Sequence, residues 1–357
     1  MRRCGMPNNE IELGVDTFGD VTAGAGGRPR PHAQVIRDVV AEGVLADEVA
    51  LDFIGVGEHH RDDFSVSAPD VVLAAIAGQT SRIRLGSAVT VLSSDDPVRV
   101  FQRFSTLDAV SNGRAEVILG RGSFIESFPL FGYALEDYEL LFEEKLDLFA
   151  RLLEGGPVSW RGQTRAPLDR QQVYPPVESG VLRTWVGVGG SPKSVVRAAR
   201  HGLPLMLAII GGEPLRFAPL VDLYHRATDE LGKPRQRVGA HCPGHVAATD
   251  EQALEQMWPH YKAMHDRIGR ERGWPPLTRE QFELTAGPDG ALFVGSPDTV
   301  AAKMVRVMTA LGLSRFDLKY SAGSLPHEQL MTTIELYGRK VAPAVRNRLK
   351  MAETAIS

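Results

Sequence analysis

The sequence predicts an α/β fold, a single (β/α)₈ TIM barrel with inserted loops, and three observations support this prediction. Eight short apolar runs alternate with longer segments of helical period, which is the number of strand-and-helix units in such a barrel. The apolar runs show little alternation with polar residues, as expected for parallel strands that are buried on both faces. The chain has 357 residues and is 43% hydrophobic, so it can build one large core.

The first four strand-and-helix units occupy the N-terminal half of the chain. Pro69 and Asp70 open the second helix, because both residue types are favoured in a first helical turn. Asn112 and Gly113 end the third helix, and the long amphipathic fourth helix ends at Gly155. The predicted strands are residues 11–18, 51–57, 83–92 and 115–120.

The second half of the chain repeats this order with two interruptions. Residues 156–180 are polar and rich in proline, and we expect an insert there that contains a small hairpin. Residues 270–300 have weak periodicity, and we expect a mobile lid because long loops commonly have this role. Neither insert is large enough for a separate domain, so residues 1–357 are predicted to form one. The remaining predicted strands are residues 184–189, 203–209, 237–248 and 315–320.

Composition and charge exclude several classes of partner. The net charge is −4 and no basic block occurs, so a nucleic acid is not expected as a partner. The longest strongly apolar run, residues 203–210, is far below the ~20 residues of a membrane helix, and no apolar segment follows the N-terminal arginines. The cysteines are Cys4 and Cys242, which is too few for a disulfide framework, so we expect a cytoplasmic protein.

The second predicted strand ends in Glu58, His59 and His60. Successive strand residues point to opposite sides, so one histidine should face the barrel mouth while the other packs under a helix. The alternative for each histidine is an ordinary hydrogen-bonded core residue. A zinc site would need further ligands at other strand ends, and the sequence has no second cluster of His, Asp or Cys there. No metal is therefore predicted.

Two other strand ends are typical of an anion site. Arg121 lies between two glycines after the fourth strand, where a guanidinium suits a phosphate or a carboxylate, although a salt bridge to a neighbouring loop is the alternative. A glycine pair then leads into the helix after the fifth strand, so free backbone N–H groups and the positive helix end point at the rim. The alternative is an ordinary helix cap. The residues of this second stretch are Gly189, Gly190, Ser191 and Ser194.

The third predicted strand has small residues that let a flat group approach its backbone. They are Gly86, Ser87 and Ala88, and on these residues alone close helix packing is the better explanation.

Taken together, these segments resemble the bacterial luciferase-like flavin monooxygenases. The likeness lies in "FIGVGEHH" (residues 53–60), "RIRLGSAVTVLSSDDPVRVFQRFSTLDAVSNGRAEVILGRG" (82–122), "FPLFG" (128–132) and "GGSPKSVVRAARHGLPL" (189–205). It is strong over residues 12–210 and extends to the C-terminal third by pattern. The combination is specific, although each piece alone is weak.

The resemblance implies a cofactor and roles for particular residues. Reduced FMN would lie at the C-terminal mouth of the barrel, with its phosphate on Arg121, Ser191 and Ser194. A non-prolyl cis peptide would lie near Ala88 and Val89, against the flavin ring. His59 would perform acid–base chemistry there, at a pKa suited to pH 7. We expect Glu58 and His60 to hold the loop in place.

The activity that the resemblance implies is a two-component monooxygenation. Reduced FMN would come from a separate NAD(P)H:flavin reductase, O₂ would be the co-substrate, and a small organic molecule would be oxygenated. Light-emitting members carry a reactive cysteine where this chain has Gly120, which argues against luciferase activity proper. The resemblance also implies a homodimer through the early helices, with residues 68–79 as a candidate face.

Other functions stay open. A deazaflavin-dependent oxidoreductase would transfer hydride without O₂, and a flavin-binding or storage protein would not need His59. A metal-dependent hydrolase is least favoured, because the first strand lacks a His-x-His pair.

Overall fold

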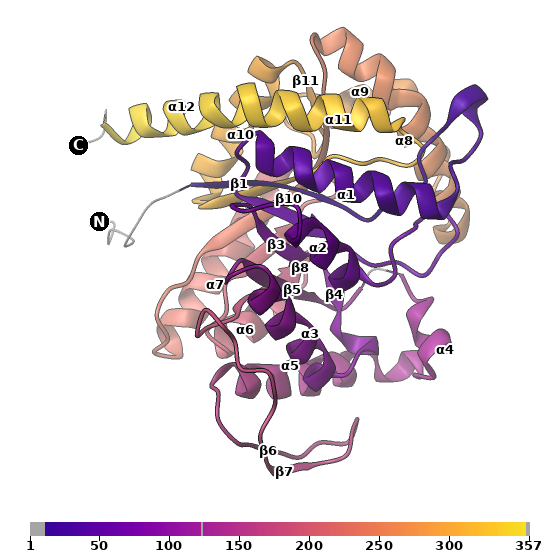
Figure 1. Cartoon of the computed structure of the whole chain (residues 1–357). Coiled ribbons are helices and arrows are strands. Elements are labelled where there is room, and N and C mark those ends of the chain that lie inside the picture. Colours follow the sequence, from indigo (N-terminus) through magenta and orange to yellow (C-terminus); the bar gives the residue numbers. More distant parts are fainter. Residues whose placement is uncertain (1–10, 123, 355–357) are drawn as a thin grey trace.

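The computed structural model describes residues 11–122 and 124–354, and within them eight parallel strands form a closed barrel (Figure 1). The ring runs in the order β1-β2-β3-β5-β8-β9-β10-β12 and closes where β12 pairs with β1. All eight predicted strands are present, so the predicted TIM barrel is confirmed. The barrel strands are β1 (Glu12–Thr17), β2 (Phe53–Val56), β3 (Arg84–Ser87), β5 (Ala115–Gly120), β8 (Arg183–Val188), β9 (Leu205–Ala208), β10 (Val238–Val246) and β12 (Arg315–Lys319).

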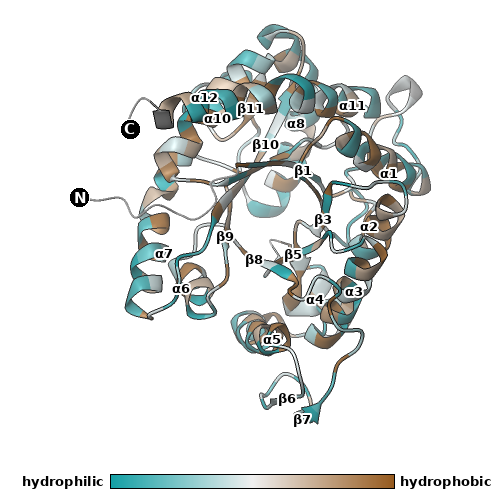
Figure 2. Cartoon of the chain, turned by 60° about the vertical axis from the view of Figure 1, so that its left-hand side comes forward, coloured by the Kyte–Doolittle hydropathy of each residue, from teal (hydrophilic) through white to brown (hydrophobic). Residues whose placement is uncertain are grey.

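Helices surround the strands and carry both hydrophilic and hydrophobic residues (Figure 2). Proline opens several of them at the first helical position, where its missing N–H costs nothing. The α-helices are α1 (His32–Glu48), α2 (Pro69–Ala77), α3 (Pro97–Val110), α4 (Ser127–Phe131), α5 (Tyr138–Leu153), α6 (Pro192–Arg200), α7 (Ala218–Glu230), α8 (Asp250–Arg272), α9 (Arg279–Ala286), α10 (Pro297–Leu311), α11 (His327–Leu336) and α12 (Ala342–Thr354).

Short elements complete the order. The two-residue strand β4 pairs with β5, and a single π-helical turn joins α11 to α12. These elements are β4 (Thr90–Val91), the 3₁₀ turns η1 (Ala25–Gly27), η2 (Leu92–Ser94), η3 (Leu135–Asp137) and η4 (Pro214–Phe217), and the π-helical turn η5 (Tyr337–Val341).

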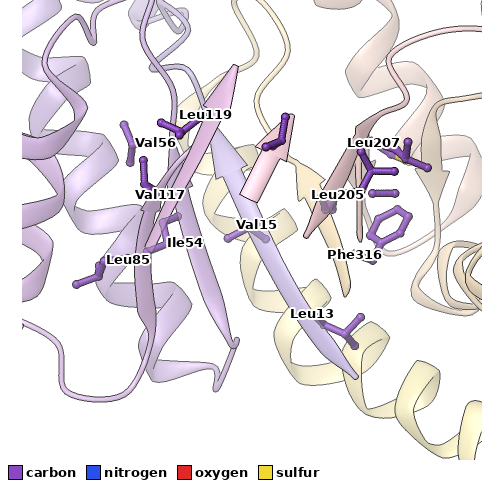
Figure 3. Close-up of a cluster of buried hydrophobic side chains, with 14 of the residues drawn as sticks. Leu13, Val15, Ile54, Val56, Leu85, Val117, Leu119, Leu205, Leu207 and Phe316 are labelled. Carbon is purple, nitrogen blue, oxygen red and sulfur yellow. The ribbon is translucent and has the colours of Figure 1, made fainter. Parts of the chain in front are cut away.

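Each barrel strand alternates between two environments. The outward residues are aliphatic and pack under the helices, as Leu13, Val15, Val117 and Leu119 do in Figure 3. The inward residues between them are often charged. The parallel strands are buried on both faces, as predicted, and their inward face holds ion pairs as well as apolar side chains.

A buried charge network fills the end of the barrel where the strands begin. Arg315 is fully buried, and its guanidinium lies 2.8 Å from the Asp317 carboxylate and also contacts Glu116. The guanidinium carbon lies 3.8 Å from the centre of the Phe53 ring, which adds a cation–π contact. This layer forms the floor of the cavity described below.

The two predicted inserts have regular structure. A hairpin of β6 (Val158–Trp160) and β7 (Leu168–Gln171) lies within residues 156–180, as expected. Residues 270–300 contain the end of α8, all of α9 and the strand β11 (Phe293–Gly295), which pairs with the second half of β10. Among the described residues of this second segment, none lines the central cavity. Its role as a mobile lid stays a prediction.

Two further sequence expectations concern the cysteines and the membrane. Cys242 is a buried free thiol on β10, and Cys4 lies outside the described residues. In the part of the chain that the structure describes, no helix is long and apolar enough to cross a bilayer.

Candidate active site

A cavity of about 440 Å³ lies at the mouth of the barrel, where the strands end. Its volume is in the range of small-molecule and cofactor sites. Most of the residues that the sequence predicted for a site line this cavity, and Ser87 and Gly190 do not. The predicted residues that line it are His59, Ala88, Val89, Arg121, Gly189, Ser191 and Ser194.

The two adjacent histidines separate as expected. His59 lines the central cavity, whereas His60 lines a smaller neighbouring pocket of about 280 Å³. The His59 ring is packed among the rings of Phe18, Phe64 and Phe124, with centroids 4.4 to 5.0 Å away. Burial among these rings lowers the pKa of His59 to about 3. The expected pKa near 7 is therefore wrong, and the imidazole is neutral at that pH.

Glu58 holds the backbone of the cavity wall. Its carboxylate accepts a hydrogen bond from the backbone N–H of Val91, and its other oxygen lies 3.9 Å from Nε2 of His60. Burial raises the pKa of Glu58 to about 7, against which the hydrogen bond from Val91 acts. These contacts agree with the expectation that Glu58 holds the loop in place.

The peptide bond between Ala88 and Val89 is cis, as the family resemblance implies. Ser87, just before it, is fully buried and does not face the cavity. Its hydroxyl donates to the carbonyl of Ile118 on β5 and accepts from Thr90. The structure thus gives Ser87 a supporting role beneath the wall, and the prediction that it contacts a cofactor is not supported by its position.

Gly120 makes close packing possible at this wall. A Cβ atom built at position 120 would lie 2.5 Å from Cγ2 of Val89, which is closer than carbon atoms approach. The position where the light-emitting members carry a cysteine is therefore filled by the Val89 side chain. This contact explains in physical terms why the residue is glycine.

Polar groups from β5, α5 and α6 form an anion cradle at one end of the cavity. Ser191 is the N-terminal cap residue of α6, and its side chain makes no capping hydrogen bond, so its hydroxyl is available to a ligand. Ser194 lies one turn into the same helix. Added Cβ atoms at Gly189 and Gly190 would meet nothing within 4 Å, so the approach to the helix N-terminus is open.

Arg121 points into this cradle but is paired with a carboxylate. Its guanidinium contacts Glu139 on α5 and lies 5.0 Å from the Tyr138 ring. Glu139 also accepts from Arg197 of α6 at 3.2 Å, and Arg197 reaches the Ser194 hydroxyl at 3.5 Å. Arg197, which the sequence reasoning missed, does not line the cavity; it pairs with Glu139 and Glu143 behind the cradle. The exposed carboxylate of Glu139 therefore pairs with the guanidinium groups of both Arg121 and Arg197. An anionic ligand group could take the place of this carboxylate beside Arg121.

A third set of polar residues lines the opposite wall and was also missed. Nδ1 of His241 on β10 lies 2.7 Å from Oδ2 of Asp16 on β1. Asp317 on β12 faces the same cavity, and burial raises its pKa to about 6 although Arg315 acts in the other direction. The period-two pattern of these strands could have indicated His241 and Asp317, because each is a polar residue between two apolar ones; Asp16 is followed by the polar Thr17.

The cavity and its anion cradle are typical of an enzyme site that binds a ligand with an anionic group at one end. Comparison with known proteins identifies the family. The model of the luciferase-like monooxygenase family matches residues 17–315. The chain belongs to this family and is an oxidoreductase enzyme.

Relatives and solved structures cover most of the chain. The 4-hydroxyprotoasukamycin monooxygenase of Streptomyces nodosus subsp. asukaensis is 28% identical over 316 residues, which are 85% of each chain. The oxygenating constituent of 3,6-diketocamphane monooxygenase from Pseudomonas putida, solved with FMN, has a TM-score of 0.75 at 18% identity and covers 94% of this chain and 98% of its own. The coenzyme F420-dependent tetrahydromethanopterin reductase of Methanopyrus kandleri has a TM-score of 0.67 at 18% identity, with 94% and 99% covered.

Proposed function

We propose that this chain is the oxygenating component of a two-component system that uses reduced FMN and O₂ to oxygenate a small organic substrate. The observation that supports this most directly is the anion cradle at the edge of a cavity that also has apolar lining at Ala88, Val89 and Ile118. A flavin mononucleotide needs both features, a site for its phosphate and a flat apolar space for its ring. The FMN-containing relative at 18% identity shares the barrel and is consistent with the choice.

The residues present suit FMN in chemical terms. The phosphate would be held by Arg121, Ser191 and Ser194, with the N-terminus of α6 adding backbone donors. The ring would lie against the wall at Ala88 and Val89. Bound reduced FMN would supply the electrons that activate O₂, as flavins do in such enzymes.

The protein's own part is to hold, orient and shield. Arg121 gains a phosphate partner in place of Glu139, so binding exchanges one ion pair for another. His59 is neutral at pH 7 and can exchange hydrogen bonds with a bound ring without carrying charge. The rings of Phe18, Phe64 and Phe124 exclude water from that side. The reductase, a homodimer and a cytoplasmic location remain parts of the proposal that rest on family likeness.

The first test is a parallel fluorescence titration with FMN, riboflavin and the deazaflavin cofactor F420. We expect FMN to bind at least about tenfold more tightly than riboflavin, because only FMN offers a phosphate to the cradle. Arg121→Ala should remove most of that difference. Arg28→Ala, which removes an exposed arginine near α1 that does not line the cavity, is the matched control. Equal binding of FMN and riboflavin to the wild type would contradict the phosphate site, and preference for F420 would favour the hydride-transferring alternative.

The second test follows oxygen. Reduced FMN and labelled O₂ are supplied to the protein with a panel of organic substrates, and label in the product is measured by mass spectrometry. Incorporation would support monooxygenation, and quantitative release of peroxide with every substrate would favour simple flavin binding. His59→Phe keeps a ring in the aromatic pocket and removes both nitrogens, so we expect incorporation to fall about tenfold or more if His59 takes part. Unchanged incorporation would show that its role is packing.

A further inference from the structure

The wall opposite the anion cradle holds a histidine–carboxylate pair that the proposed function leaves unassigned. Asp16 is buried and accepts from Nδ1–H of His241. A carboxylate on Nδ1 fixes the proton there and leaves Nε2 with a lone pair. Within the described residues, no protein group forms a hydrogen bond with Nε2 of His241, and the residue lines the cavity. The other oxygen of Asp16, Oδ1, is buried without a hydrogen-bond partner there.

The surroundings of this pair restrict what it can bind. Asp317 is the register partner of His241 on β12 and lines the same cavity, while Ala208 is its partner on β9. Arg315 pairs with Asp317, and Lys319 is taken by Asp20. Two carboxylates therefore flank the imidazole, and the neighbouring cations are already paired. A ligand that arrives neutral and carries a hydrogen-bond donor would find an acceptor here.

Apolar side chains lie beside this pair in the cavity. The Phe18 ring stacks beside His241 with its centroid 6.0 Å away, and Met206 of the neighbouring strand β9 also lines the cavity. His59 contacts the same Phe18 ring, with the two centroids 4.8 Å apart. A ligand here would meet an aromatic surface next to an imidazole that two carboxylates flank.

We propose that His241 binds the hydroxyl group of a neutral, largely aromatic substrate, a phenol or an enol, and accepts its proton. The O–H bond breaks, its electron pair stays on the substrate oxygen, and the proton forms a bond to Nε2. Asp16 is the positioning residue, which fixes the tautomer and offsets the charge of the imidazolium. The resulting phenolate or enolate has more electron density on its carbon atoms, which is what an oxygenating enzyme needs. The inference deepens the proposed function and rests on it for the final reaction.

The test compares 4-nitrophenol with 4-nitroanisole, which has the same ring but no hydroxyl proton. Binding to the full chain without added flavin is followed by difference absorbance, at a pH below the ionisation of free 4-nitrophenol. We expect at least about tenfold preference for the phenol and a phenolate spectrum in the complex, because a site built to bind a hydroxyl rejects its absence. His241→Asn retains a donor for Asp16 but removes Nε2, so the preference should fall to within about twofold.

His245→Asn is the matched control. His245 lies on the same strand but is fully buried between Thr333 and Gln256 and does not line the cavity, so the preference should persist in that variant. Equal binding of the two probes to the wild type, or a preference that survives His241→Asn, would overturn the inference. If FMN binds in the Arg121-dependent manner but the phenol preference is absent, the inference fails and the proposed function stands. If the phenol preference is present but FMN does not bind, the role of His241 stands and the proposed FMN-dependent function fails.

A second measurement observes the tautomer of His241 in the wild-type protein. Nitrogen-15 NMR of histidine-labelled wild-type protein reports which ring nitrogen carries the proton, with the His241 signal assigned by its change in Asp16→Asn. A proton on Nδ1 and a bare Nε2 are expected. A proton on Nε2 would overturn the inference, because no acceptor would then face the cavity.

Discussion

The two histidines on the cavity wall differ in what surrounds them, and this difference separates their chemistry. His59 is enclosed by three phenylalanine rings and has no carboxylate partner among the described residues, so its charged form is disfavoured. His241, on the other side of Phe18, has the Asp16 carboxylate at hydrogen-bond distance. An imidazole that must carry a proton transiently needs such a partner.

Glu58 allows a residue-scale prediction about stability and pH. Its pKa is raised from 4.5 to about 7 in the folded protein, chiefly by burial. A carboxyl whose pKa is higher in the folded than in the unfolded state destabilises the fold once it is ionised. The destabilisation is therefore absent below about pH 4 and reaches its full size above about pH 7. Glu58→Gln keeps an oxygen for the Val91 N–H and removes the charge. We expect it to be more stable than wild type by on the order of 1–3 kcal/mol at about pH 8, with little gain near pH 4.

Urea unfolding at the two pH values measures this difference. The interpretation is wrong if the variant and the wild type differ by the same free energy at both, because the effect would then come from packing and not from ionisation.

At the scale of the elements, a buried carboxylate ties the first helix to the last part of the barrel. Glu42 on α1 accepts from the hydroxyl of Tyr320 at 2.7 Å and lies 2.8 Å from Nδ1 of His327 at the start of α11. Arg30 adds an ion pair to Glu328 at 2.8 Å. The helices that close the ring between β12 and β1 are therefore held by polar contacts as well as by the aliphatic core.

This tie predicts a loss of stability with rising pH. The hydrogen bond to Glu42 raises the pKa of His327 above its ordinary 6.5, against the effect of burial. The charged form therefore adds stability that is fully present below pH 6.5 and disappears as the pH rises through the folded pKa. In His327→Gln, the melting temperature measured by circular dichroism should therefore change less with pH across that range than it does in the wild type. A wild type and a variant with the same dependence on pH would show that this pair does not govern it.

At the scale of the whole molecule, the barrel divides into a closed end and an open end. Arg315, Glu116 and Asp317 fill the end where the strands begin, and the cavity occupies the other end. The barrel therefore has charged residues at both levels, but those at the closed end are satisfied by one another. Asp16 and His241 line the cavity at the open end, and within the described residues Oδ1 of Asp16 and Nε2 of His241 form no hydrogen bond with a protein group. Function in barrels of this type collects at that end.

The sequence predicted the fold well because the rhythm of strands and helices is a local signal. The predicted anion residues also gather in one cavity, since glycines beside Arg121 and before Ser191 mark strand ends whatever the detailed packing. The pKa of His59 could not be predicted, because the rings that enclose it come from three separate segments. Asp16 and His241 were missed because their strands were taken as continuously apolar, although "GVDTF" and "GAHCP" both place a polar residue at an inward position.

The contact between Gly120 and Val89 also restricts how this barrel can change during evolution. A thiol at position 120 needs a Cβ where the Val89 side chain already lies, so Gly120→Cys alone would force the wall to move. Replacement of Val89 by a smaller residue would relieve this contact, so packing couples the side chains that positions 89 and 120 can accept.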